Sequence, residues 1–191
     1  MEIWKSIIKS KLGICDHRIY ARKCSLVQVD SRTAREFFTE NHLAGFIPAQ
    51  HYYGLEYEGK TVSMISFGIS RFSKNENEIY RFASLKGYSV IGAFGKFVSN
   101  LKLHDYASFA DRRFSGPDCV YSKFFSQRKA LPPSWWGMEV GVYDPKHRLN
   151  FTKQKLKMMI PNYDDSRSAI DNMLDNGFDM IYDCGNWKFS N

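Results

Sequence analysis

The sequence predicts a single α/β domain in which helices flank a mixed, mostly antiparallel central sheet. Three observations support this fold class. Residues 51–57 and 61–69 alternate like two strands joined by a short Gly-containing loop, which is typical of a hairpin. Strand-like and helix-like patterns alternate in the second half of the chain. The length of 191 residues and the hydrophobic fraction of 43% suit one domain with its own core. We expect residues 1–22 to form a helical appendage and residues 23–191 to form the domain.

The first half of the chain contains the clearest elements. Residues 1–14 place apolar side chains at helical spacing up to Gly13, and residues 24–29 alternate like a strand. Asp30 and Ser31 can cap a helix that continues to about His42. After the hairpin, residues 78–85 predict a third strand that ends before Gly87.

The second half alternates between the two kinds of element. We expect a turn and helix over residues 90–103, a strand over 105–111, a loop over 112–118 and a helix over 119–130. A strand over 135–143, helices near 149–160 and 166–176, and a last strand over 178–184 follow.

Composition restricts the class of partner. The formal charge is +7, from 27 Lys and Arg against 20 Asp and Glu, and 16% of the residues are aromatic. Positive charge favours a polyanion such as nucleic acid, and aromatic rings can stack on bases or fill a core. A basic protein without such a partner is the alternative.

Four cysteines lack C-x-x-C spacing, so we expect reduced thiols, no metal site and a cytoplasmic protein. No apolar run approaches the roughly 20 residues that a spanning helix needs, and no membrane partner is expected. The N-terminal apolar segment is too short and too interrupted by Lys for a signal peptide.

The strongest local motif is the predicted strand–GAFGK–helix transition. Gly92 and Gly95 allow close backbone approach, and a helix N-terminus offers free N–H groups to a phosphate. Lys96 adds a positive charge, although the spacing is not that of a Walker loop. The motif predicts a phosphate or pyrophosphate site; a turn that uses glycine for packing alone explains it as well.

A second motif, SFADRRFSG, ends a predicted strand at Asp111. Ligands of open α/β sheets favour the carboxyl ends of strands, so Asp111 is a candidate general base. Arg112 and Arg113 follow directly and can bind phosphates. The alternative is that Asp111 caps the loop that follows it.

The loop NHLAGFIPAQ contains His42 beside the predicted hairpin. We consider His42 a candidate catalytic or binding residue, because loops of this kind contact substrates. A solvated or hydrogen-bonded histidine is the alternative.

The run KHRLNFTKQKLK forms a basic patch with Arg148, Lys153 and Lys157. Such a patch can follow a phosphate backbone, although a solvated helix face accounts for it too. Of the neighbouring Trp135 and Trp136, one should face outward from a strand and be free to stack on a base.

The order of these motifs resembles the Gcn5-related N-acetyltransferase (GNAT) fold. In that resemblance VIGAFGKFV corresponds to the pyrophosphate turn, so Ile91, Gly92, Ala93, Gly95 and Lys96 would hold acyl-CoA or another phosphate-bearing donor. VYSKFF resembles a late helix of the family, and Tyr121 would take the position of its acid. Ser89, Phe94 and Phe125 stand where the family pattern has other residues.

Two narrower resemblances point to phage proteins. SFAD followed by Gly116 and Tyr121 is similar to the phage Mu Mom family of DNA-modifying proteins, in which Asp111 would be the key acid. Segments such as NHLAGF, SFADRRFSG and IYDCGNWKF resemble the region downstream of the nuclease core in phage homing endonucleases of the Vsr-like EDxHD group. The acidic nuclease cluster is absent from this sequence. The resemblance implies kinship with these endonucleases without the cutting activity, in a phage-infected bacterial host.

Three functions remain open at this point. One is group transfer to a nucleobase or another nucleic-acid-linked acceptor, with Asp111 as base, Tyr121 as acid and His42 as an additional catalytic residue. The second is DNA binding without catalysis, by Arg112, Arg113 and the basic patch. The third is an accessory protein that binds a host protein. The first requires exposed amides at Gly92 and Gly95, whereas the second allows Phe94 or Ser89 to fill the turn.

Overall fold

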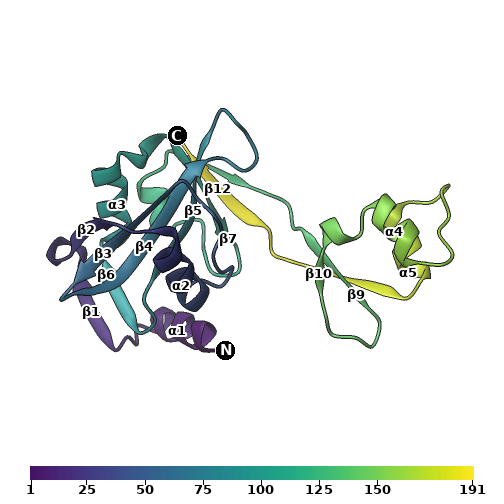
Figure 1. Cartoon of the computed structure of the whole chain (residues 1–191), viewed down its shortest axis with the longest axis horizontal. Helices are drawn as coiled ribbons and strands as arrows, with labels where there is room; N and C mark the ends of the chain where they lie inside the picture. Colours follow the sequence, from purple (N-terminus) through teal and green to yellow (C-terminus); the bar gives the residue numbers. More distant parts are fainter. The chain divides into compact units, whose positions relative to one another are not determined.

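The protein is described here by a computed structural model that covers all 191 residues (Figure 1). It forms two compact units. Unit 1 comprises Met1–Ala110, Ser115–Lys129 and Lys188–Asn191, and unit 2 comprises Asp111–Phe114 and Ala130–Trp187. Residues 23–191 are therefore divided between two units, whereas the sequence predicted one domain, and the predicted appendage belongs to unit 1. None of the helices is both long and apolar enough to cross a membrane.

Unit 1 carries the large sheet. Its helices are α1 (Glu2–Lys11), α2 (Ser31–Asn41) and α3 (Ala93–Leu101), with 3-10 turns η1 (Ala21–Lys23), η2 (Leu103–Asp105) and η3 (Val120–Lys123). The seven strands are, in spatial order, β2 (Ser25–Gln28), β3 (His51–Tyr57), β4 (Lys60–Ile69), β5 (Asn77–Ser84), β7 (Tyr106–Asp111), β12 (Asn186–Ser190) and β8 (Gln127–Ala130). The last three continue along the chain into unit 2.

The pairing within this sheet is mixed. From β2 to β5 neighbouring strands are antiparallel, and β5 and β7 are parallel. A separate parallel pair joins β1 (His17–Tyr20) to β6 (Tyr88–Ile91). The predicted α/β class is confirmed: helices flank a mixed, mostly antiparallel central sheet.

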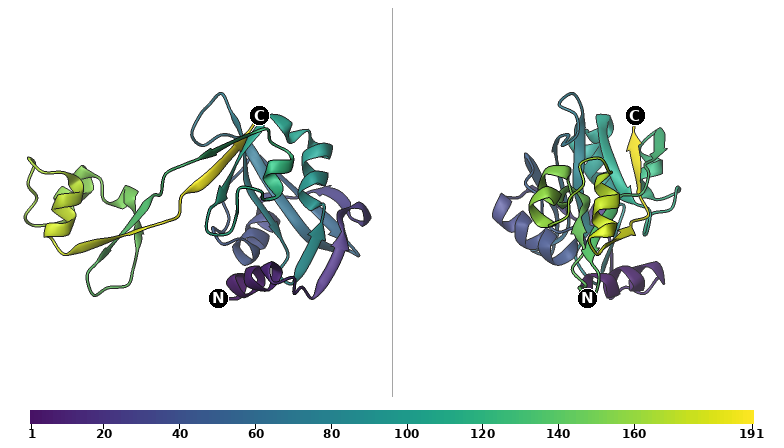
Figure 2. Two further views of the ribbon diagram at one scale, coloured as in Figure 1. Left: turned by 180° about the vertical axis from the view of Figure 1, so that it is seen from behind. Right: turned by 90° about the vertical axis from the view of Figure 1, so that its right-hand side faces the viewer.

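Two helices cover opposite faces of the sheet. The Asp30 carboxylate caps α2 by accepting hydrogen bonds from the amides of Arg32 and Thr33, as the sequence predicted. Helix α2 buries Phe38 in a cluster that includes Ala83 of β5, while α3 packs Phe94 against Phe82, the preceding residue. Because successive side chains of a strand point to opposite faces, α2 and α3 lie on opposite sides of the sheet (Figures 1 and 2).

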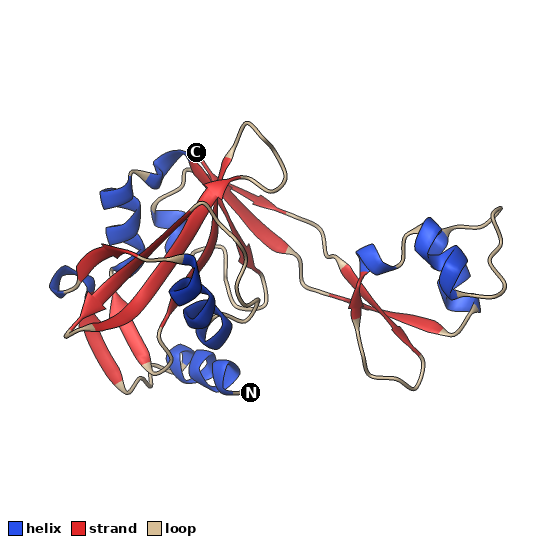
Figure 3. Ribbon diagram, viewed as in Figure 1, coloured by secondary structure: helices blue, strands red, loops and turns tan.

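Unit 2 has its own small core. Strands β10 (Lys146–His147), β9 (Trp135–Glu139) and β11 (Phe178–Tyr182) form an antiparallel sheet in that order. The turn η4 (Arg148–Asn150) and the helices α4 (Lys153–Met159) and α5 (Ala169–Asp175) lie between β10 and β11 in the chain (Figure 3). Phe151, Leu156, Ile160 and Met173 form the buried cluster. Residues 130–187 therefore have a buried cluster of their own.

Most predicted elements are present, with one clear exception. The predicted helix over residues 119–130 is instead the short turn η3 followed by strand β8. Phe124 and Phe125 both turn toward the ring of Phe94, at centroid distances of 5.5 and 6.3 Å, and the chain beyond them joins the sheet. Tertiary packing and strand pairing therefore outweigh the local helical pattern. The strand before the glycine turn is present as β6, whereas β1, β8, β10 and β12 were not predicted, because most are short and lack strong alternation.

Candidate functional site

The glycine turn lies where the sequence placed it. Strand β6 ends at Ile91, Gly92 adopts a left-handed conformation with φ of 81°, and α3 begins at Ala93. Glycine reaches this conformation at little steric cost. No side chain caps the N-terminus of α3. The backbone geometry of a phosphate-binding turn is therefore present.

Side chains nevertheless occupy this turn. Phe94 is only 2% exposed and packs edge-on against Tyr121 and Phe124. A Cβ atom added to Gly95 would lie 2.8 Å from Cζ of Phe124, so this ring rests directly on the Gly95 backbone. The small residue at position 95 thus serves packing within the protein.

Lys96 is also engaged internally. Its Nζ donates a hydrogen bond to the carbonyl of Ala21, at 3.0 Å, and a second to the carbonyl of Cys24. Lys96, which the sequence predicted to bind phosphate, instead links α3 to η1 and the residue after it. The predicted donor residues are together in space, and two of them, Gly95 and Lys96, make contacts that a donor would have to displace.

Tyr121, the predicted acid, is packed between rings. It stacks on Phe189 at 5.4 Å and meets Phe94 edge-on at 4.6 Å. Burial raises the pKa of Tyr121 to about 12, and a hydrogen bond with the Ser108 hydroxyl offsets this only in part. A general acid works best when its pKa is near the operating pH, so this environment is unfavourable for proton transfer.

Asp111 is bound by Arg113, two residues further along the chain. Its carboxylate accepts hydrogen bonds from the Arg113 amide at 2.8 Å and from the Arg113 guanidinium, which makes an ion pair with it. This is the capping role that the sequence left open as the alternative. The hydrogen bond to Asp111 raises the pKa of Arg113. Arg112 lies over the ring of Trp187, at 5.1 Å from its centroid.

His42 ends α2 in a half-buried position. Its Nδ1 accepts a hydrogen bond from the Ala44 amide at 3.1 Å. Burial, with a smaller contribution from the positive charge of Arg81, lowers the pKa of His42 to about 4. The ring is therefore neutral at pH 7 with its proton on Nε2, which makes it a hydrogen-bond donor rather than a ready general base.

The predicted basic patch lies in unit 2 and is partly neutralised. Lys157 forms an ion pair with Asp165 and lies over the ring of Tyr163. Lys153 and Arg148 are exposed. Trp135 packs against Phe151 in the core, so the outward-facing tryptophan is Trp136, which is 40% exposed. The expectation that one of the two tryptophans faces outward is confirmed.

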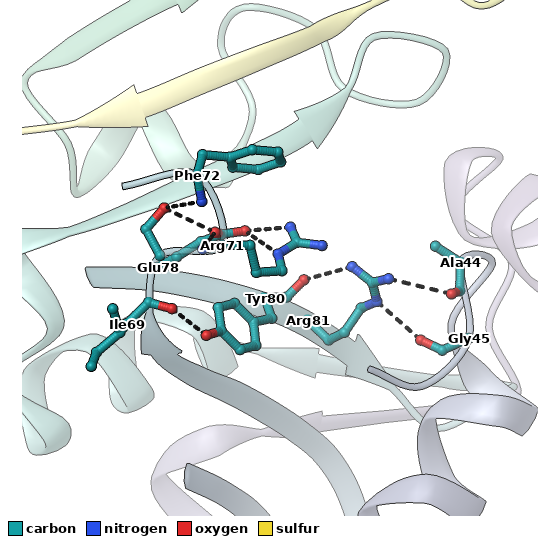
Figure 4. Close-up of polar contacts among 9 residues, drawn as sticks. Ala44, Gly45, Ile69, Arg71, Phe72, Glu78, Tyr80 and Arg81 are labelled. Atoms are coloured by element: carbon teal, nitrogen blue, oxygen red, sulfur yellow. Dashed lines mark hydrogen bonds and ion pairs between the residues drawn. The ribbon is translucent and has the colours of Figure 1, made fainter. Parts of the chain in front are cut away.

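Sequence inspection missed a buried ionic network in unit 1. Glu78 of β5 is fully buried, and its carboxylate accepts hydrogen bonds from the Ser70 hydroxyl (3.3 Å), the Arg71 amide (3.1 Å) and the Arg71 Nε (3.0 Å), with an ion pair to the Arg71 guanidinium (Figure 4). The one sequence signal was an acidic residue at an inward-facing strand position.

Arg81 of the same strand ties down a second loop. Its guanidinium donates hydrogen bonds to the carbonyls of Gly45 (3.0 Å), Tyr80 (2.9 Å) and Ala44 (3.3 Å) (Figure 4). Strand β5 therefore holds both the loop after α2 and the loop between β4 and β5. Tyr80 is the extra residue where the β4–β5 register shifts, and its hydroxyl donates to the Ile69 carbonyl.

Charge is distributed unevenly between the units. Unit 2 has eight Lys and Arg against nine Asp and Glu, a net charge of −1. Unit 1 has 19 Lys and Arg against 11 Asp and Glu, a net charge of +8. Residues 1–23 alone carry six Lys and Arg against Glu2 and Asp16. The positive charge of the protein therefore belongs to unit 1, and not to the unit that contains the predicted basic patch.

A shallow pocket opens beside this N-terminal segment. Its volume is about 270 Å³, and residues of α1 line it together with those at 86–88. Lys5, Lys9 and Lys86 contribute positive charge, and Glu2 and Asp16 oppose it. No group of three or more His, Cys, Asp or Glu side chains is placed to hold a metal ion.

The protein therefore combines an α/β fold with a glycine turn at the start of α3. Among solved structures, the ribosomal-protein-S18-alanine N-acetyltransferase from Escherichia coli is similar to this chain, with a TM-score of 0.44 and 8% sequence identity. The match covers 65% of this chain and 88% of that one. No protein-family model and no curated protein sequence matches the chain.

Proposed function

We propose that this GNAT-like protein binds nucleic acid, DNA in particular, through the positively charged surface of unit 1. The separation of charge carries the proposal: unit 1 has a net charge of +8, and unit 2 has −1. A protein that neutralises phosphates with Lys and Arg releases condensed counterions, which drives binding. The phage context rests on the sequence resemblances described above.

The contacts that the predicted transfer residues make within the protein favour binding over catalysis. Lys96, Asp111 and Tyr121 each have partners within the protein. The Phe124 ring packs against Gly95 at the turn that the transfer hypothesis assigns to the donor. In this proposal the GNAT-like fold serves to present the positively charged surface of unit 1.

The test compares two pairs of lysines. Lys9 and Lys86 line the pocket of unit 1 and form no salt bridge, whereas Lys153 and Lys157 belong to the sequence-predicted patch of unit 2. Binding of a labelled DNA duplex is measured by fluorescence anisotropy over a series of salt concentrations, for the wild type and for the variants K9A/K86A and K153A/K157A.

We expect wild-type affinity to fall steeply with salt. K9A/K86A should weaken binding and reduce the slope of log K against log [salt] by roughly two, since each phosphate contact contributes about 0.9. K153A/K157A serves as the charge-matched control and should change the slope little. Absent or salt-insensitive binding of the wild type would refute the proposal.

Group transfer is a second candidate, and one observation favours it. The parallel ladder between β5 and β7 pairs only residues 77–79 with 106–108, so no ladder joins the remainder of the two strands beside the Gly92 turn. An acyl-CoA donor held at Ile91–Lys96 would require Phe124 to move. If acyl-CoA raises the melting temperature of F124A and not of the wild type, Phe124 blocks a latent donor site. If it raises neither, and D111N leaves DNA modification in expressing cells unchanged, this candidate is excluded.

A further inference from the structure

The loop between β4 and β5, residues 70–76, exposes a single aromatic ring. Phe72 is 74% exposed. Its ring meets Phe109 of β7 edge-on at a centroid distance of 5.5 Å, so one part is supported and the rest faces solvent. A ring with one supported edge and an open remainder is available for stacking on a flat ligand.

Hydrogen bonds to buried Glu78 hold the start of this loop. Buried Glu78 accepts hydrogen bonds from the Ser70 hydroxyl and from the amide and side chain of Arg71 (Figure 4). The Ser70 Oγ in turn accepts a hydrogen bond from the Phe72 amide at 3.2 Å, and the Ser70 amide donates to the Glu76 carbonyl at 2.8 Å. The backbone of the loop at Phe72 is therefore held before any ligand arrives, which lowers the entropy cost of binding.

Positive charge flanks the ring. The Arg71 guanidinium lies 5.3 Å from the centroid of Phe72, and Lys74 is exposed on the same loop. The acidic Glu76 is paired with Lys188, at 3.0 Å. The charge of Arg71 is paired with Glu78, so Lys74 is the cation of this loop that forms no salt bridge. An exposed ring with a cation two residues away suits a ligand that combines a flat apolar face with negative charge, which describes a nucleobase on its phosphate backbone.

We infer that Phe72 stacks on an unpaired base of bound nucleic acid, with Lys74 beside a flanking phosphate. This inference rests on the proposed nucleic-acid binding and adds the form of the ligand, which is a single strand or an unstacked base. Glu78 acts as a positioning residue, since it touches the loop and not the ligand.

The experiment compares F72A with F72W and with Y143A, which removes another exposed aromatic ring, 87% exposed, in unit 2. Affinity is measured by anisotropy with a labelled single-stranded oligonucleotide, and stacking is read from the fluorescence of 2-aminopurine within it. F72A should weaken single-strand binding roughly ten-fold and abolish the 2-aminopurine response, with the salt slope unchanged. F72W should retain both, and Y143A should match the wild type.

Equal affinity and equal 2-aminopurine signals for F72A and the wild type would overturn the inference and leave the proposed nucleic-acid binding intact. A wild type that binds the DNA duplex but not the single strand would overturn the inference alone, and one that binds neither would overturn both. Phe72-dependent binding to phosphatidylglycerol vesicles, without binding to oligonucleotides, would identify a membrane ligand and overturn both as well.

Discussion

Removal of the Glu78 carboxylate should destabilise unit 1 more than any surface charge change. In E78A the Ser70 hydroxyl, the Arg71 amide and the Arg71 guanidinium lose their common acceptor. Breaking a buried ion pair costs about 3–5 kcal/mol. Because the Arg71 side chain is 34% exposed and can be rehydrated, we expect the lower end of this range, about 3 kcal/mol.

Two conservative variants refine this magnitude. E78Q keeps a side-chain oxygen as acceptor but loses the charge, so we expect a loss of about 1–2 kcal/mol. R71K keeps the positive charge but loses the forked contact of the guanidinium, and it should cost about 1 kcal/mol. The order E78A, E78Q, R71K follows from the number of donors left without their partner.

The assay must report on unit 1 alone, because a chain with two compact units need not unfold in one step. Hydrogen exchange of the β4–β5 hairpin in increasing urea gives its free energy of opening. E36A is the matched control, since Glu36 is an exposed partner of Arg32 on α2 and contributes little. A loss below about 1 kcal/mol in E78A would contradict the buried-acceptor argument.

Three further predictions concern the residues of the candidate site. Folding lowers the pKa of His42 from 6.5 to about 4, so between these pH values the unfolded chain binds more protons than the folded one. The free energy of unfolding therefore falls as the pH drops from 6.5 to about 4. The variant H42Q should remove up to about 3 kcal/mol of this pH dependence, measured by urea titrations at acid pH. K96M removes two hydrogen bonds to η1 and should lower the free energy of unfolding by about 1.5–3 kcal/mol in the same exchange assay; unchanged stability with weaker anion binding would mean that Lys96 is a ligand after all. Y121F keeps the ring packing and loses one hydrogen bond, so a cost of about 1 kcal/mol is expected, and a much larger loss of hairpin stability would show that the hydroxyl supports the core.

The sequence predicted elements whose signals are local. Helix α2 was located from Asp30 and from the spacing of Phe37 and Phe38, and the structure confirms both the cap and the buried face. The hairpin of β3 and β4 and the turn at Gly92 were located in the same way. Each depends on residues within a few positions of one another, so a short window of sequence contains the information.

Local sequence patterns could not predict which side chains fill the candidate site. Phe124 covers Gly95, the carbonyl of Ala21 binds Lys96, and Phe189 stacks on Tyr121. These partners are far apart in the chain, and their meeting depends on how helices and strands pack. The sequence could identify which residues have the right chemistry, but not which of them the fold had already engaged.

By itself, the sequence determined the overall positive charge, the α/β fold class and the position of the glycine turn, because these depend on composition and local pattern. Tertiary structure alone decided that the charge belongs to unit 1, that the turn is filled by aromatic rings and that buried Glu78 presents Phe72 to solvent. The physical reason is that burial and pairing are properties of residues brought together by folding, and the same side chain can be a ligand or a structural contact depending on what packs against it.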